Sequence, residues 1–213
     1  TRRKIIKVAS EDIINYPLLK YLSGLKNKIF ILSTGMANNF EIQKAIKIFK
    51  KNKIILMHCV SLYPTRIKEA NLNRIAILRK KYNLEVGYSD HTLGLEALKV
   101  AASMNCYIFE KHFTLSKKLN GPDHHMSINP LELKKITQKI KEIYSLKGNG
   151  EIGPINRQLI ASKKFRRSIV AIKPIKKGQK ILKDMIGLKR PSNGIHPINI
   201  KKVIGKKAKK NFK

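Results

Sequence analysis

Short apolar runs alternate with amphipathic segments along the first two thirds of the chain, and this alternation dictates the class of fold. The apolar runs have the length of strands, and the segments between them repeat apolar residues at helical spacing. The predicted strands are 4–10, 28–33, 53–59, 84–89 and 106–112, and the predicted helices are 17–25, 39–49, 72–82, 95–104 and 130–146. Strands that alternate with helices at this spacing predict βαβ units and a parallel sheet in an α/β fold.

Each predicted strand ends in polar residues, such as Ser33 and Thr34 after the second and Asp90 and His91 after the fourth. In parallel α/β folds the chemistry lies beyond the carboxyl ends of the strands. A doubly wound sheet concentrates its site at one switch point, whereas polar groups at every strand end favour a (β/α)₈ TIM barrel. Five strands do not close such a barrel, and the chain starts at Thr1 almost directly in an apolar strand. We therefore expect a fragment that lacks three upstream strands.

The pattern changes after residue 147. The stretch that follows holds Gly148, Gly150 and Gly153 just before Pro154, which is typical of a linker. Residues 165–213 contain short strands and turn signals with little helix. We therefore expect a barrel portion at 1–147, a linker at 148–164 and a small β-rich domain at 165–213.

The chain is strongly basic, because 46 Lys and Arg against 13 Asp and Glu give a net charge of +33 in 213 residues. Such a charge is typical of proteins that bind nucleic acid or another polyanion. Lys, Ile and Asn are abundant in every type of segment, however, which is the bias that an AT-rich genome produces. We therefore predict that nucleic-acid binding is not the main function and that the substrates are anionic.

Two features bear on the compartment. No apolar run approaches the roughly 20 residues that a membrane-spanning helix needs, so we expect no membrane span. The two cysteines, Cys59 and Cys106, lie in apolar runs. This excludes a disulfide scaffold and predicts two buried free thiols in a reducing compartment, the cytoplasm.

Two histidines are the strongest metal candidates. His91 and His112 each follow an apolar strand and are 21 residues apart, about one βα unit, so they are expected on adjacent strands at the same end of the sheet. Imidazole nitrogens are common ligands of transition metals, and two of them leave positions open for a substrate. The alternative is that one or both only bond loop backbone. Asp90 either orients His91 or caps the following helix.

Other polar residues near the strand ends suit an anionic substrate. Lys7, Ser10, Ser33 and Ser61 are the kind of donors that bind phosphate. Asp123 lies on a turn after the last predicted strand, where a carboxylate binds a sugar hydroxyl, takes a proton or only forms the turn. The sequence has no Walker loop, no GxGxxG and no nucleophile elbow.

These segments resemble the signatures of the sialic acid synthase family. The first part of the chain carries KVASEDIINYPLL (7–19), ILSTGMA (31–37), HCVSLYPT (58–65), VGYSDHTLG (86–94), FEKHFTL (109–115) and GPDHHMS (121–127). The last part carries FRRSIVA (165–171), IKKGQ (175–179) and LKRPSNGI (188–195), which resemble the antifreeze-like (SAF) domain of that family. The resemblance covers essentially the whole chain. It implies strands four to eight of a TIM barrel, followed by most of an SAF (β-clip) domain.

The resemblance also implies an activity. The family condenses phosphoenolpyruvate with an N-acylated mannosamine-type sugar to a nine-carbon 2-keto sugar acid and phosphate, with a divalent metal, commonly manganese, or magnesium. By motif, His91 and His112 match the metal-binding histidines, and Lys7, Ser10 and Ser33 match the positions that hold phosphoenolpyruvate. The other positions carried over by motif are Ser61, where some members have Asn; Asp12, where many have Glu toward the sugar; and Tyr63 and Asp123 on the sugar side.

Arg190 matches an arginine that the SAF domain lends to the neighbouring subunit, which implies a domain-swapped homodimer. On this interpretation the catalytic set is Asp12, Asp123 and the two histidines. Two alternatives stay open. One is a truncated, non-catalytic remnant that binds carbohydrate, and the other is a basic nucleic-acid-binding protein, which would show a steep salt dependence of DNA affinity.

Overall fold

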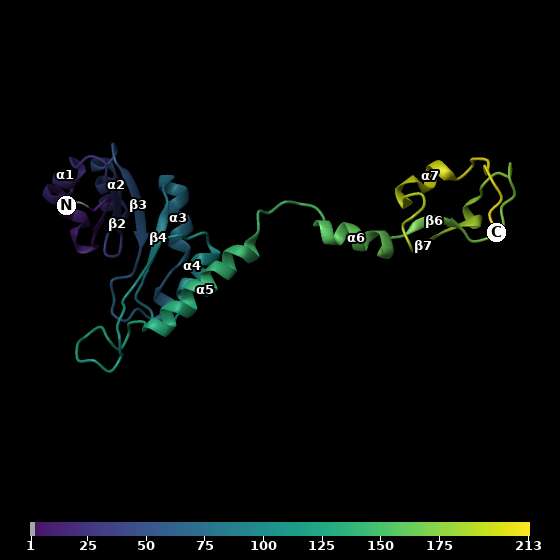
Figure 1. The fold of residues 1–213 in the computed structure, drawn as a ribbon. Helices are drawn as coiled ribbons and strands as arrows, with labels where there is room; N and C mark the ends of the chain where they lie inside the picture. Colours follow the sequence, from purple (N-terminus) through teal and green to yellow (C-terminus); the bar gives the residue numbers. More distant parts are fainter. Residues whose placement is uncertain (1–2) are drawn as a thin grey trace. The chain divides into compact units, whose positions relative to one another are not determined.

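The computed structural model describes residues 3–213 and divides the chain into two compact units, residues 1–149 and 150–213 (Figure 1). The first unit holds a five-stranded sheet in the order β1-β2-β3-β4-β5, in which every pair of neighbours is parallel. The strands are β1 (Ile5–Val8), β2 (Ile29–Ser33), β3 (Lys53–His58), β4 (Val86–Asp90) and β5 (Phe109–Lys111). This confirms the predicted α/β fold with a parallel sheet.

Helices connect these strands and begin where local signals place them. They are α1 (Tyr16–Ser23), α2 (Asn39–Ile48), α3 (Asn73–Tyr82), α4 (Glu96–Ser103) and α5 (Pro130–Lys147), with the short 3₁₀ turns η1 (Glu11–Ile14) and η2 (Ile67–Glu69). The side chain of Asn38 accepts hydrogen bonds from the first-turn amides of α2, and Glu41 bonds back to the Asn38 amide. Asn129 and Glu132 form the same capping box before Pro130 on α5.

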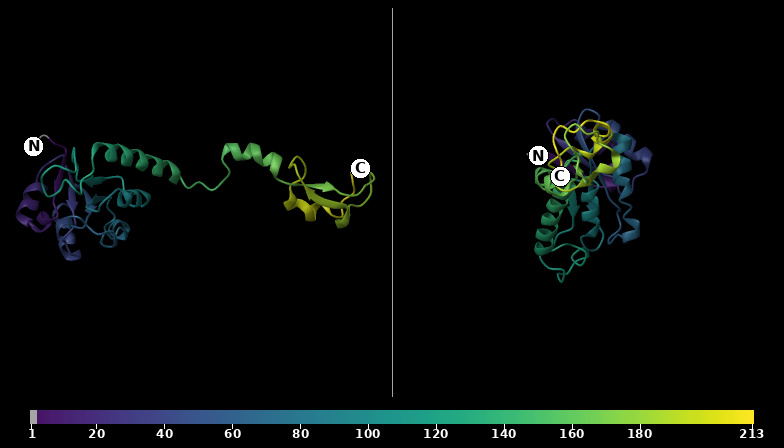
Figure 2. Two further views of the ribbon diagram at one scale, coloured as in Figure 1. Left: turned by 90° about the horizontal axis from the view of Figure 1, so that it is seen from below. Right: turned by 90° about the vertical axis from the view of Figure 1, so that its right-hand side faces the viewer.

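The core lies between the helices and one face of the sheet (Figure 2). Side chains alternate between the two faces of a strand, so Phe30 and Leu32 of β2 point to the helix side with Leu56 of β3. These residues pack with buried side chains of the helices such as Leu19 and Ile75. The opposite face carries Lys7, Ser33, Ser89 and Glu110, so polar side chains from four strands share that face.

The sheet is curled about that polar face. Lys7 on β1 and Glu110 on β5 belong to the two outermost strands, yet Lys7 Nζ lies 3.4 Å from Glu110 Oε1. In a flat sheet the two strands would lie about 19 Å apart, at roughly 4.8 Å per step, which is beyond the reach of the two side chains. The five strands therefore form a curved half-barrel whose concave face gathers the polar side chains.

The second unit contains a small antiparallel sheet of β6 (Ser168–Ala171) and β7 (Ile186–Lys189). Ile169, Ile175, Ile186 and Ala208 form its buried core. The remaining elements are α6 (Asn156–Phe165), α7 (Ile200–Val203), η3 (Lys183–Met185) and η4 (Pro197–Asn199). The stretch expected as a linker, 148–164, thus includes most of a helix. The pattern did not reveal α6 because the helix begins directly after the glycines and Pro154 that are typical of a linker.

Both cysteines are buried and free, as predicted, and Cys106 Sγ donates to the carbonyl of Val86 at 3.0 Å. Within residues 3–213, no helix combines the length and the apolar character needed to cross a membrane.

Candidate active site

The hydroxyls of Ser10 and Ser61 surround Gly35 just beyond the strand ends, and Ser33 is the last residue of β2, two residues before that glycine. Ser10 Oγ accepts a hydrogen bond from the Gly35 amide at 3.2 Å and shares another with Cys59 Sγ at 3.1 Å. The hydroxyl oxygens of Ser33 and Ser61 are buried and find no hydrogen-bond partner within residues 3–213. Buried hydroxyls without partners are costly, so this cluster favours a ligand that supplies hydrogen-bond acceptors.

Glycine is the only residue type that fits at position 35. A Cβ at position 35 would lie 2.7 Å from Ser10 Oγ and 2.9 Å from Cys59 Sγ, and closer still to Ser61 Oγ. The absence of a side chain therefore lets the hydroxyls surround the backbone and leaves room beside them.

If this cluster binds phosphoenolpyruvate, as the resemblance implies, replacing Gly35 by alanine is expected to weaken that binding about 10- to 100-fold, because the new methyl group displaces Ser10 and Ser61. The measurement is the KM for phosphoenolpyruvate in a phosphate-release assay. Gly153→Ala is the matched control, since a Cβ there meets nothing within 4 Å and neither Gly35 nor Gly153 has the positive φ that alanine resists. An unchanged KM in Gly35→Ala would contradict the assignment of this cluster.

A charged pair extends the cluster across the concave face. Lys7 Nζ lies 3.4 Å from Glu110 Oε1, and the same carboxylate oxygen accepts a hydrogen bond from Ser89 Oγ at 2.8 Å. Both charged side chains are partly exposed, at 32% and 41%. Lys7 is thus a cation on the open face with only one carboxylate beside it, which suits the binding of a second anion.

The two predicted metal-binding histidines lie side by side. The ring centres of His91 and His112 are 5.6 Å apart, and the ring of Tyr63 contacts both, at 4.3 Å and 5.6 Å. His91 Nδ1 donates to the carbonyl of Val60 at 2.7 Å. This bond leaves Nε2 as the nitrogen with a free lone pair, and Nε2 lies 3.4 Å from Ser89 Oγ.

The histidine pair fits a divalent metal as two of its ligands. Within residues 3–213, no three His, Cys, Asp or Glu side chains come together as a complete metal site. Burial lowers the pKa of His91, so its imidazole stays neutral and able to coordinate. A metal held here would keep several positions for water or substrate, the arrangement of a catalytic rather than a structural site.

Acidification is expected to destabilise the first unit through His58 and His91. Burial lowers the pKa of both imidazoles, so they stay neutral in the folded chain where the unfolded chain takes up protons. Their contribution is complete above the ordinary histidine pKa of about 6.5 and falls below it, by up to about 1.4 kcal/mol per pH unit for each group. Urea unfolding from about pH 7.5 to about pH 5 measures the slope. His58→Gln, which removes one titrating group, should flatten it, and an equal slope in that variant would contradict this origin.

Asp123 lies next to His112. Its carboxylate is 3.7 Å from His112 Nδ1, and its backbone carbonyl accepts a bond from Ser127 Oγ at 2.7 Å, which fixes the turn.

Asp12 lies in η1, where its carboxylate accepts a hydrogen bond from the Asn15 side chain, and within residues 3–213 no hydrogen bond or ion pair ties it to the histidines. Arg190 belongs to the second unit, where its guanidinium is 6.0 Å from the ring centre of Phe165.

Asp90 makes neither a direct bond to His91 nor the predicted helix cap. Its carboxylate accepts hydrogen bonds from Thr92 and Tyr88 and pairs with Lys111, so it does not bond to His91. It does not cap α4 either, since Leu95 is the residue that precedes that helix. Adjacent strand residues point to opposite faces, which is why Asp90 turns away from the histidine side.

Glu110 is the site residue that sequence reasoning missed. It connects Lys7 to Ser89, and it precedes His112 by two residues on β5. Because strand side chains have a period of two, a carboxylate two residues before a candidate metal ligand faces the same side. That spacing was the available signal.

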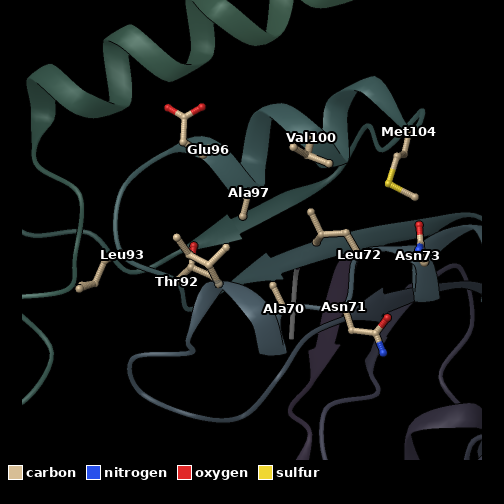
Figure 3. Close-up of a pocket in the computed structure, with 11 residues that line it drawn as sticks. Ala70, Asn71, Leu72, Asn73, Thr92, Leu93, Glu96, Ala97, Val100 and Met104 are labelled. Carbon is tan, nitrogen blue, oxygen red and sulfur yellow. The ribbon is translucent and has the colours of Figure 1, made fainter.

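A separate pocket of about 370 Å³ lies on the helix side of the sheet. Figure 3 shows its walls, with Leu72 and Asn71 before α3, Thr92 and Leu93 after β4, Val100 on α4 and Met104 just after that helix. It contains none of the predicted site residues. The candidate site is thus defined by the strand ends on the concave face rather than by this hollow.

Comparisons with known proteins agree with this arrangement. The sequence profile of the NeuB family matches residues 1–152, and that of the SAF domain matches residues 166–213. The chain is 40% identical to an N,N'-diacetyllegionaminic acid synthase of Campylobacter jejuni, over 99% of this chain and 64% of that protein. It is 36% identical to a protein of the same name from Legionella pneumophila, over 98% of this chain and 60% of that protein.

The fold has solved counterparts. A crystal structure of an N-acetylneuraminic acid (sialic acid) synthetase from Leptospira borgpetersenii, in complex with citrate, is 38% identical and superimposes with a TM-score of 0.70. The match covers 75% of this chain and 56% of that chain. The chain spans between 60% and 64% of the length of these curated relatives.

Proposed function

The chain belongs to the NeuB family, the sialic acid synthases, and from that premise we propose that it condenses phosphoenolpyruvate with an N-acylated mannosamine-type sugar. The products are a nine-carbon 2-keto sugar acid and phosphate. The observation that carries the proposal is the cluster of Lys7 with the unpartnered hydroxyls of Ser33 and Ser61, beside two adjacent histidines. A cation and free hydroxyl donors suit phosphate and carboxylate groups, and the histidines suit a divalent metal.

His91 and His112 would hold the metal, which we propose is manganese or magnesium. When bound, such an ion supplies a Lewis acid that polarises the aldehyde of the open-chain sugar. Manganese agrees better with two imidazole ligands, since magnesium prefers oxygen ligands almost exclusively.

The chain's own residues position the two substrates. Lys7, Ser10, Ser33 and Ser61 hold phosphoenolpyruvate so that its enol carbon faces the sugar aldehyde, and Lys7 stabilises the negative charge that spreads over the anion. Tyr63 packs against both histidines with 54% of its surface exposed, and it would contact the sugar.

Carboxylates handle protons and water. The enol carbon forms the new bond to the aldehyde carbon, water adds to the carbon that carries the phosphate, and phosphate leaves. Asp123, close to His112, and Glu110, close to Lys7, are the carboxylates placed to orient that water or accept its proton. Asp12 would contact the sugar from the loop after β1 and share in this chemistry.

The proposal also covers the complete fold, the second subunit and the cellular compartment. The curled sheet corresponds to strands four to eight of a TIM barrel, which its curvature supports. The second unit is the SAF domain, and its Arg190 reaches the site of a second subunit in a domain-swapped homodimer. The enzyme works in the cytoplasm, in keeping with two free buried thiols.

The test follows phosphate release from phosphoenolpyruvate by the whole protein in which these 213 residues occur. Each candidate sugar is added in turn, with manganese and with chelator: N-acetylmannosamine, its 6-phosphate, and the diacetamido sugar precursors of legionaminic and pseudaminic acids. Release that needs both one sugar and the metal is the expected result. No release with any sugar from a folded protein would overturn the proposal and favour a carbohydrate-binding role, while salt-sensitive DNA binding would favour the nucleic-acid alternative.

A further inference from the structure

A buried ion pair lies directly behind the two histidines. Asp90 on β4 and Lys111 on β5 are register partners on adjacent parallel strands, and Lys111 Nζ is 2.7 Å from Asp90 Oδ2. Their side chains are 0% and 5% exposed. Each is followed in the chain by a histidine of the candidate site, Asp90 by His91 and Lys111 by His112.

Both members of the pair make further hydrogen bonds. Asp90 Oδ1 accepts bonds from the Thr92 amide and hydroxyl, both at 2.8 Å, and from Tyr88 OH at 3.1 Å. Lys111 Nζ also donates to the carbonyl of Thr92 at 2.6 Å. The network therefore ties the residues on both sides of His91 to the residue before His112 and fixes the geometry at both strand ends.

A buried ion pair is weak evidence for stability, because desolvation offsets much of the attraction. The pair has a clearer effect on the relative position of β4 and β5, because the bonds of a buried hydrogen-bonded network form together in only one arrangement of the strands. The backbone of His91 is also held by the Thr65 amide, which donates to the His91 carbonyl at 2.8 Å. Beyond the backbone pairing of β4 and β5, the ion pair adds a side-chain link between the residues that directly precede the two histidines.

We propose that the Asp90–Lys111 pair is a positioning device that sets the separation of His91 and His112 for one divalent metal. The proposal rests on the proposed function, in which these histidines hold that metal. Residues that orient metal ligands without touching the metal typically change metal affinity 10- to 100-fold when they are replaced. Asp90 and Lys111 are expected to act in that range although neither coordinates the ion.

The test measures manganese affinity of the whole protein by electron paramagnetic resonance and calorimetry, with no substrate present. Asp90→Asn and Lys111→Met are expected to weaken manganese binding about 10- to 100-fold. The double variant, Asp90→Asn with Lys111→Met, leaves no buried charge unpaired and is expected to recover stability against urea while manganese affinity stays low. That divergence is a result that a purely structural role would not produce.

Leu19→Ala is the matched control, because Leu19 is fully buried in α1 of the same unit and its loss destabilises by packing alone. It should unfold at lower urea and bind manganese as the unaltered protein does. If Asp90→Asn and Lys111→Met fold and bind manganese with unaltered affinity, the positioning role is wrong and the proposed function is unaffected. If the unaltered protein and His91→Ala both fail to bind manganese, the metal site of the proposed function fails and the positioning role fails with it.

Discussion

Replacing His91 or His112 by alanine is expected to lower metal-dependent phosphate release about 1000-fold. The two rings lie 5.6 Å apart, and no third ligating side chain joins them within residues 3–213, so the loss of one ring removes half of the protein's hold on the ion. A metal that polarises a carbonyl contributes several kcal/mol to the transition state, and about 1.4 kcal/mol corresponds to a factor of ten.

The control for this experiment is His125→Ala. His125 is exposed on the turn beside Asp123, so it resembles the candidate ligands in type and neighbourhood without contacting either ring. His91→Asn is a useful companion, because its amide can still donate to the Val60 carbonyl that His91 binds. Chelated protein, His91→Ala and His112→Ala should show the same residual activity. If either variant keeps full metal-dependent release, the histidine pair does not hold the catalytic metal.

The order of helices and strands was predictable because each element is determined locally. Asn38 and Glu41 predict the start of α2, Pro130 fits the first turn of α5, and the apolar runs mark the strands. The parallel sheet follows from the alternation of strands and helices. An exception is α6, which begins directly after a Gly- and Pro-containing stretch, so its residues were assigned to the linker.

The histidine pair was predictable as well, since its spacing of one βα unit places both rings at the same end of adjacent strands. The ion-pair partner of Lys7 was not predictable from the sequence. Its pairing with Glu110 depends on the curvature of the whole sheet, which no local pattern encodes. For Asp90 the sequence suggested a contact that the structure lacks. Its position next to His91 predicted a bond between the two side chains, but neighbouring residues of a strand point to opposite faces, and Asp90 pairs with Lys111 instead.

The roles that came from resemblance alone have different support in the structure. Ser33 and Ser61 have buried hydroxyls with no partner within residues 3–213, and Ser61 lies with Ser10 around Gly35, which agrees with an anion-binding role. Asp12 bonds to Asn15 in η1 instead, and its role toward the sugar stays a prediction. A motif match places a residue on an element, but the bonds that the residue makes there depend on its neighbours in space.

Replacing Lys7 by methionine is expected to lower kcat/KM for phosphoenolpyruvate 100- to 1000-fold, the range found when a cationic clamp or oxyanion donor is removed. Two effects add. The anion loses its cation on the concave face, and Glu110, whose carboxylate lies 3.4 Å from Lys7 Nζ, is left unpaired and repels the substrate. The two effects separate in the double variant Lys7→Met with Glu110→Gln, which removes the repulsion and should recover part of the substrate affinity without restoring the catalytic rate.

Lys4→Met controls for the change in net charge, because Lys4 is an exposed lysine just before the same strand. In this strongly basic chain, a general electrostatic attraction of the substrate would make the two lysine variants equivalent, and added salt would weaken substrate binding to both in the same way. A large loss in Lys7→Met alone, which salt cannot mimic, would show that one positioned cation, rather than the net charge of +33, selects phosphoenolpyruvate. Equal small losses in both variants would remove Lys7 from the anion site and leave the serine hydroxyls as its only supported members.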